Sequence, residues 1–302
     1  MKILIPIDGS PLSEAAVEFV AGRSTLIGTS PEISLVNVQL PISAQAERII
    51  GRAATRGIYQ ERTDKIAKRP LAQLKAAGLD ARVVVAVGSP GDAIAQEAGR
   101  HGADLIVMGS HGRSEFKRVL LGSVAYAVLM KTHVPVLLLR GKAAPKRESL
   151  RVVIALDGSR LGLEAVKYAL RHREMFGAEP AFTLIHVASD FVMPLAGDMT
   201  GATATVYTPE QIDAMRDAAY EAAFEPARKL MRRAQVPFSE ARLIGIAGDE
   251  IAAFARKSAD LTLLGSHGYG ALKAAVLGSV AMRVAASGNT PLLIVRPRRA
   301  RR

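Results

Sequence analysis

The chain has 302 residues, of which 49% are hydrophobic and 23% charged, and these values predict two globular domains. The absence of cysteine excludes disulfides, zinc–thiolate centres and thiol catalysis. No run reaches the roughly 18 apolar residues that span a membrane, and the N-terminal segment meets Asp8 too early for a signal peptide, so we expect a cytoplasmic protein.

Short β-branched runs alternate with helical patterns along the first half of the chain. The runs are apolar throughout, as strands buried on both faces are, and lie at about residues 2–7, 33–38, 82–87, 104–108 and 135–139. Between them, helical spacing recurs at 10–24, 62–78 and 90–102, the first of these opening with the cap and proline pair Ser10–Pro11. This rhythm predicts parallel strands joined by right-handed crossovers.

The second half repeats the first. Residues 152–169 match 3–20, so that Asp8 and Asp157 are 149 positions apart, and 290–296 match 134–140 at a spacing of 156. Thr208–Pro209 opens another helix, with a capping-box glutamine at Gln211. The sequence therefore predicts two doubly wound α/β units with five parallel strands each, in residues 1–140 and 151–297, with a linker at 141–150 and a basic tail at 298–302.

One phrase of glycine and serine occurs in both copies. MGSHGRSEFKRVLLGSV spans 108–124, LGSHGYGALKAAVLGSV spans 264–280, and each connects a predicted strand to a helix. Such a connection at the carboxyl end of a strand points backbone amides at an anion, and small residues let a phosphate approach closely. We therefore expect phosphate binding, with positive φ at the first glycines, rather than only a tight turn. The small residues are Gly109, Gly112, Gly122 and Ser123 in copy one, and Gly265, Gly268, Gly278 and Ser279 in copy two.

The spacing G-x2-G-x9-G-S after a strand, together with an aspartate ending a first strand such as ILIPIDGS, resembles the universal stress proteins. The resemblance covers nearly the whole chain, twice. It implies the strand order 3-2-1-4-5 of adenine nucleotide alpha hydrolase-like domains, and ATP bound with Mg²⁺ and with its phosphates on the glycine phrase. Members without these glycines do not bind ATP, and here both phrases are complete.

The resemblance also carries further positions over to this chain. It implies that strand ends contact the nucleoside, that the second strand reads adenine through its backbone, and that the residues flanking the glycine phrase pack on the ligand. For the aspartates, helix capping is an equal alternative, and Ala155 departs from the family's proline. The positions are Pro6, Asp8, Val38, Met108 and Val124 in copy one, and Asp157, Val187, Leu264 and Val280 in copy two.

Several charged residues invite other interpretations. His111 and His267 have no neighbouring carboxylate to orient them, so we interpret them as bystanders rather than as catalytic groups. Lys117 and Lys273 either touch phosphate or are solvated, and Arg113 has no counterpart because copy two has Tyr269. The two sites need not be equal.

The net charge of +12 is divided as +7 in residues 1–148 and +5 in residues 149–302, the latter owing to the terminal RPRRARR. Arg48, Arg52 and Arg56 recur at helical spacing. Both features are compatible with nucleic-acid binding. We prefer a disordered, solubilising tail and a solvated helix face, because no set of aromatic residues is interleaved with the arginines.

We therefore expect an ATP-binding regulatory stress protein with little turnover and an unidentified protein partner. The alternatives are a slow ATP hydrolase or phosphotransferase on the same site, and a partner- or nucleic-acid-binding module. In the implied order the last strands, 135–139 and 291–295, are apolar sheet edges that would promote aggregation if left uncovered. We expect them to pair antiparallel within the chain as a pseudo-dimer, and any further homodimer to use another face.

Overall fold

The computed structural model describes residues 1–23, 27, 30–110, 121–140, 145, 147–189, 208–266 and 277–296. Copy one comprises β1 (Lys2–Pro6), α1 (Pro11–Ala21), β2 (Glu32–Gln39), α2 (Ala44–Ile50), α3 (Arg52–Ala76), β3 (Ala81–Val87), α4 (Pro90–Arg100), β4 (Leu105–Gly109), α5 (Ser123–Lys131) and β5 (Val136–Leu139). Copy two comprises β6 (Arg151–Leu156), α6 (Arg160–Arg171), the 3₁₀ turn η1 (Arg173–Phe176), β7 (Ala181–Ala188), α7 (Pro209–Arg233), β8 (Phe238–Ile244), α8 (Ala247–Ser258), β9 (Leu261–Gly265), α9 (Ser279–Ser287) and β10 (Leu292–Val295).

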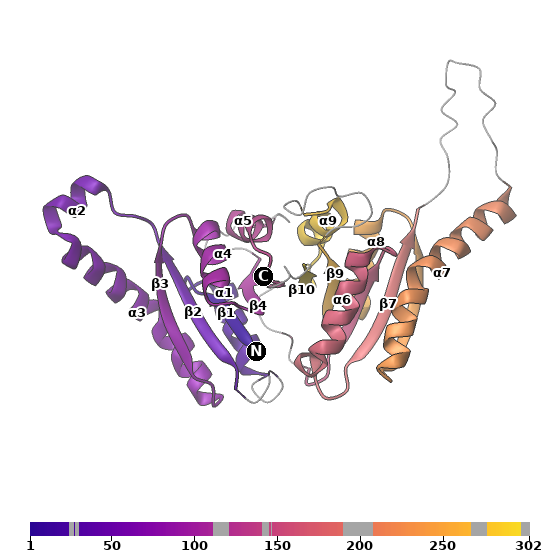
Figure 1. Ribbon diagram of the computed structural model, residues 1–302, viewed down its shortest axis with the longest axis horizontal. Helices are drawn as coiled ribbons and strands as arrows, with labels where there is room; N and C mark the ends of the chain where they lie inside the picture. Colours follow the sequence, from indigo (N-terminus) through magenta and orange to yellow (C-terminus); the bar gives the residue numbers. More distant parts are fainter. Residues whose placement is uncertain are drawn as a thin grey trace, which may run out of the picture.

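The five predicted strands of copy one are all present, in the order β3-β2-β1-β4-β5. Copy two has the equivalent order β8-β7-β6-β9-β10, and the pairs within each copy are parallel. The predicted α/β class and the implied strand order are thus confirmed. The two sheets form one continuous sheet of ten strands, which Figure 1 displays as two halves meeting at the centre.

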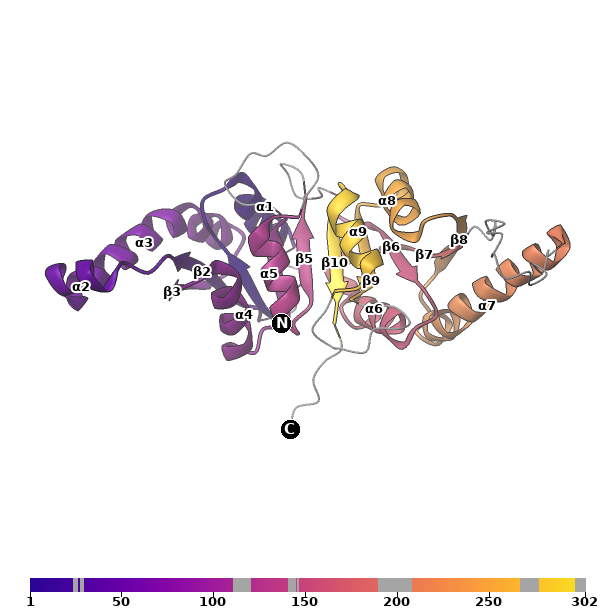
Figure 2. The ribbon, with the colours of Figure 1, turned by 90° about the horizontal axis from the view of Figure 1, so that it is seen from above.

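The halves join through antiparallel pairing of β5 with β10, here called the seam (Figure 2). Leu137 pairs with Leu293, and because 137 + 156 = 293 these are equivalent residues of the two copies. A local twofold relation therefore passes between them. The expected pairing of the two edge strands is found, and it removes both apolar edges from solvent.

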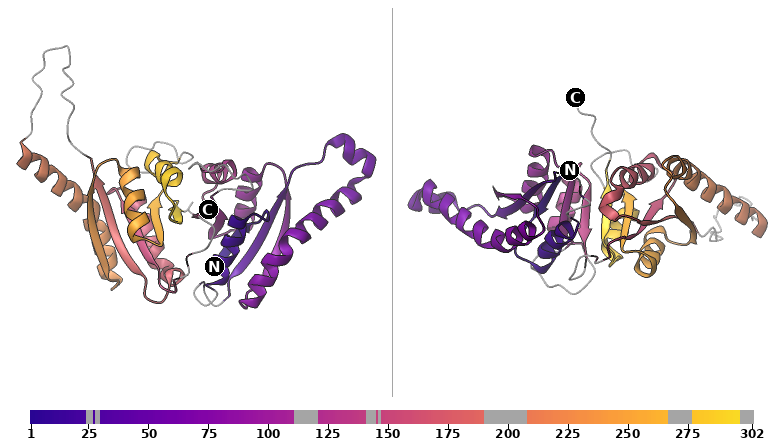
Figure 3. Two further views of the ribbon diagram at one scale, coloured as in Figure 1. Left: turned by 180° about the vertical axis from the view of Figure 1, so that it is seen from behind. Right: turned by 90° about the horizontal axis from the view of Figure 1, so that it is seen from below.

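Helices cover both faces of the continuous sheet, as the views in Figure 3 show. The helices α1, α3, α6 and α7 pack over one hydrophobic core, and α4, α5, α8 and α9 pack over the other. The seam residues alternate between these cores, so that Leu137 and Leu293 lie in the first while Leu138 and Ile294 lie in the second. Both cores thus run without interruption from one copy into the other.

Local signals set the helix starts. Ser10 caps α1 by accepting from the Ser13 N–H at 3.2 Å, with Pro11 at the first helical position. Thr208 and Gln211 form the predicted capping box of α7. The helix α3 is longer than the predicted 62–78, because it begins at Arg52 and continues through Pro70. No helix in the described part of the chain is long and apolar enough to cross a membrane.

Candidate functional site

The carboxyl edge of the copy-one sheet carries a cavity of about 890 Å³, here called the copy-one cavity. It lies where the strand order reverses between β1, which continues to β2, and β4, which continues to β5. Crossovers leave opposite faces of a doubly wound sheet at such a point, so that a crevice remains between them. The cavity volume is within the range of small-molecule sites.

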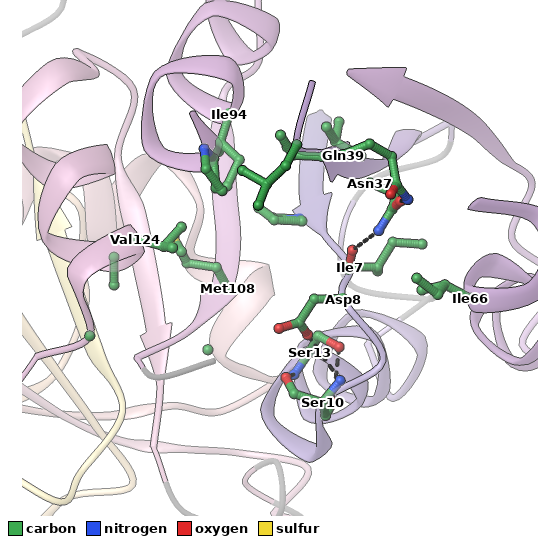
Figure 4. A pocket seen from close by; sticks show the side chains of 18 of the residues that line it. Ile7, Asp8, Ser10, Ser13, Asn37, Gln39, Ile66, Ile94, Met108 and Val124 are labelled. Atoms are coloured by element: carbon green, nitrogen blue, oxygen red, sulfur yellow. Dashed lines mark hydrogen bonds between the residues drawn. The ribbon is translucent and has the colours of Figure 1, made fainter. Parts of the chain in front are cut away.

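The cavity brings together eight of the nine copy-one residues that sequence reasoning selected. The ninth, Gly112, lies outside the described residues, as do His111, Arg113 and Lys117. Figure 4 shows Met108 and Val124 on one side of the cavity and Asp8 on the other. The eight lining residues come from β1 and the turn after it, β2, β4 and the start of α5, and are Pro6, Asp8, Val38, Met108, Gly109, Gly122, Ser123 and Val124.

The turn after β1 fixes Asp8 in the cavity wall. Gly9 has a φ of 78°, a conformation that favours glycine, and the Asp8 Oδ1 accepts from the Ser10 N–H at 2.9 Å. Copy two repeats this turn, because Gly158 has a φ of 77° and Asp157 accepts from the Ser159 N–H at 2.9 Å. The capping alternative for the aspartates therefore needs correction: the serines cap the helices, and each aspartate instead stabilises the turn before the cap.

The start of α5 lies at the cavity and has no side-chain cap among the described residues. Gly122 stands at the N-cap position, where it makes no side-chain cap, and the Gly122 N–H donates to the Ser110 carbonyl at 2.8 Å. This bond closes the connection that follows β4. The first N–H groups of a helix lack intrahelical partners, so an uncapped start presents them to an anion. The same arrangement begins α9, where Gly278 donates to Ser266 at 2.8 Å.

The glycines are not all explained by the expected backbone conformation. Gly109 and Gly265 end strands without positive φ, and Gly122 has a φ of −59°, so the expectation of positive φ at Gly109 was wrong. At Gly265 a Cβ would lie 2.7 Å from the Leu161 carbonyl oxygen, so packing against α6 requires a glycine there. At Gly122 the φ of −59° is one that other residues also adopt, so the backbone conformation does not require a glycine there.

The remaining copy-two candidates occupy equivalent places. Val187 lies on β7, Leu264 and Gly265 end β9, and α9 begins at Ser279 with Val280 next. Register pairs Ala155 of β6 with Leu264 of β9, so these strand ends are neighbours at one edge. Gly268, His267, Lys273 and Tyr269 lie outside the described residues.

Sequence reasoning missed a polar group in the wall of the copy-one cavity. Asn37 is 2% exposed, donates from Nδ2 to the Ile7 carbonyl at 2.7 Å, and accepts from the Thr63 hydroxyl at 3.0 Å. In copy two His186 replaces it and places Nδ1 2.8 Å from the Leu156 carbonyl, and because a carbonyl only accepts, Nδ1 is the donor. A buried polar residue inside the apolar run SLVNV was the available signal.

Two cations of α3 were also missed. Arg62 and Lys65 line the copy-one cavity next to Ile66. The helices α3 and α7 end in equivalent turns, because the Leu79 N–H donates to Leu74 and the Val236 N–H to Met231, both at 3.0 Å. Aligning these two turns places Leu79 opposite Val236, 157 positions apart. At the same spacing, Arg62 and Lys65 correspond to the uncharged Ala219 and Ala222.

A family model described as the universal stress protein family matches residues 1–140 and again 149–296. The chain belongs to the universal stress protein family. A universal stress protein of Mycolicibacterium smegmatis is 30% identical over 201 residues, and the match spans 65% of this chain and 63% of that relative. Universal stress protein MJ0577 of Methanocaldococcus jannaschii is 30% identical over 156 residues, 47% of this chain and 95% of the relative.

Solved structures support the fold of this universal stress protein. A universal stress protein from Archaeoglobus fulgidus superposes with a TM-score of 0.69 at 22% identity, covering 98% of both chains. A likeness at this identity supports the architecture of the tandem pair and does not identify a ligand. The ligand must be inferred from the cavity itself.

Proposed function

We propose that the protein binds ATP at each glycine–serine phrase and acts as a nucleotide-binding regulatory protein of the universal stress class. The observation that carries this proposal is the copy-one cavity, in which the uncapped start of α5 faces an apolar wall formed by Val38, Ile94 and Met108. The amides of an uncapped helix start suit phosphate oxygens, and an apolar wall suits a purine base. Copy two carries the same uncapped helix start at Gly278.

The polar groups of the cavity fit the other parts of a nucleotide. The Asp8 carboxylate and the carbonyls at the end of β2 can accept from hydroxyl and amino groups of a nucleoside, and Arg62 and Lys65 add positive charge. The described residues contain no group of three metal-binding side chains. We therefore infer that any Mg²⁺ is held chiefly by the phosphates, where it would neutralise their charge.

Calorimetric titration of the whole chain with ATP in the presence of Mg²⁺ tests the proposal. We expect saturable binding with a stoichiometry of two, and weaker binding of adenosine, which lacks the phosphates. Absence of ATP binding to folded protein would contradict the proposal. In that case the basic surface, including the exposed Arg48, Arg52 and Arg56, would become the stronger candidate as a module for a polyanionic partner.

Hydrolysis should be slow. Backbone amides bind the ground state and the transition state alike, and such uniform binding does not accelerate chemistry. Among the described lining residues Asp8 is the only carboxylate, and one of its oxygens already accepts from Ser10. We expect phosphate release under excess ATP to remain far below the ~10 per second typical of enzymes. A rate in that range would favour the hydrolase alternative.

The two sites should differ in their dependence on salt. Removing both cations with Arg62→Ala and Lys65→Ala should weaken ATP binding at copy one roughly threefold to tenfold, because exposed charges contribute modestly and are screened. The binding can be measured by calorimetry at several salt concentrations with copy two blocked by Gly278→Val. The matched control is Ala219→Arg with Ala222→Lys, which should strengthen copy two when Gly122→Val blocks copy one. No change in either background would show that α3 and α7 do not face the ligand.

A further inference from the structure

Two buried arginines follow the edge strands of the seam. Arg140 comes directly after β5 and Arg296 directly after β10, and they are equivalent because 140 + 156 = 296. They are only 8% and 3% exposed. Each side chain crosses the seam and ends at a helix of the other copy.

The arginines bind carbonyls at the carboxyl ends of α9 and α5. The Arg140 guanidinium donates from Nη1 to the Gly288 carbonyl and from Nη2 to the Ala285 carbonyl. Arg296 donates from Nη2 to the Leu129 carbonyl. The last carbonyls of a helix lack intrahelical donors and form the negative end of its dipole. A buried cation there donates hydrogen bonds to these carbonyls and balances their negative charge.

No carboxylate shares in this arrangement among the described residues. Burial, without an opposing acid, lowers the pKa of Arg140 to about 10 and also lowers the pKa of Arg296. A pKa of about 10 leaves Arg140 charged at neutral pH. The carbonyls at the end of α9 therefore compensate the charge of Arg140, and the carbonyl near the end of α5 compensates that of Arg296.

These two helices are the ones that begin at the candidate phosphate sites. The helix α5 starts at Ser123 and α9 at Ser279, and each has nine residues, which corresponds to a length of about 14 Å. When a short helix is held by hydrogen bonds at its carboxyl end, its amino end has little freedom to move. The position of the anion-facing amides in one copy is thus tied to an arginine of the other.

We propose that Arg296 and Arg140 are positioning residues that act across the seam, Arg296 on the copy-one site through α5 and Arg140 on the copy-two site through α9. The ligand group concerned is the phosphate of the nucleotide, so the proposal rests on the proposed function. Neither arginine contacts the ligand. Each nucleotide site is then complete only when the other copy is in place.

The test is a crossed measurement of ATP affinity. With copy two blocked by Gly278→Val, Arg296→Met should weaken binding at copy one on the order of fivefold to tenfold, while Arg140→Met should leave it unchanged. With copy one blocked by Gly122→Val, the effects should exchange. Equal weakening of both sites by either variant, or unchanged affinity in both backgrounds, would overturn the proposal.

Two controls keep the result independent of folding. Arg283→Met removes a charge from α9 at an exposed ion pair with Asp249 and should leave both affinities unchanged, since Arg283 does not serve the helix end. If the methionine variants do not fold, Arg296→Lys and Arg140→Lys can replace them, because lysine keeps the charge but lacks the planar guanidinium. We expect the same crossed pattern, with a smaller loss of affinity. An uncrossed pattern in folded lysine variants would also overturn the proposal.

A second readout separates this proposal from the proposed function. If the unsubstituted chain binds no ATP, the proposed function fails. Hydrogen exchange still measures whether Arg296 stabilises α5 and Arg140 stabilises α9. Arg296→Met should speed exchange of the α5 amides and spare α9, and Arg140→Met should do the reverse. Uniform or absent changes in exchange would show that the arginines do not position these helices.

Discussion

A chain carrying Leu138→Lys and Ile294→Lys is expected to lose the seam and to unfold or separate into halves. Both side chains are 0% exposed and lie in the core that runs beneath α5 and α9. Each substitution forfeits about 2–3 kcal/mol of apolar burial and places a charge where desolvation costs several kcal/mol more. Together these losses approach the roughly 5–15 kcal/mol that stabilises an ordinary domain.

The expected result is a larger radius in small-angle scattering and a melting temperature lowered by ten degrees or more, as an order of magnitude. The matched control is Val87→Lys with Ile244→Lys, which places the same two charges on the outer edge strands β3 and β8. These side chains are 47% and 46% exposed and equivalent between the copies, so the control should fold normally. A native radius and melting temperature in the seam variant would show that β5 and β10 do not hold the halves together.

A chain carrying Gly122→Val and Gly278→Val should fold normally and lose ATP binding by about a hundredfold or more, which corresponds to roughly 2.7 kcal/mol. The two glycines have φ values of −59° and −63°, which valine also adopts, so the backbone is not strained. The new side chain stands at the uncapped helix start and occupies the space that a phosphate would need. Calorimetry measures the affinity, and circular dichroism checks the fold.

Gly57→Val with Gly99→Val is the control for loss of two glycines. Both lie on helices with open space around them and away from the copy-one cavity, so affinity should be retained. Undiminished affinity in the Gly122 and Gly278 variant would show that the phosphates bind elsewhere. In that case the aspartate turn and the α3 cations would have to carry the site.

Local features of the fold could be predicted because each is encoded within a few residues. The Ser10 cap and the Thr208 capping box need only neighbours in sequence, and the structure contains both. The strands were recognised because parallel strands buried on both faces are apolar throughout. The pairing of β5 with β10 followed from the same reasoning, since an apolar edge must be covered.

Features that depend on distant partners were not predicted. Nothing near Arg140 or Arg296 in sequence indicates a helix end as its partner, because Arg140 and Gly288 are 148 positions apart. Arg62 and Lys65 were not selected from the sequence, because only the packing of α3 places them beside the cavity. Gly265 was interpreted through its ligand, whereas contact with α6 is a sufficient cause. In each case tertiary packing assigns the role.

Leu137 and Leu293 pair across the seam within one covalent chain, which distinguishes this protein from a dimer of separate subunits. The two halves meet at an effective concentration set by the connecting segment, so dilution does not part them. Both halves also belong to one chain, so a substitution in one half leaves the other half unchanged. Asn37 and His186, or Arg62 and Ala219, are differences of this kind. A fused pair can therefore keep one site constant while the other is adjusted to a new affinity or ligand.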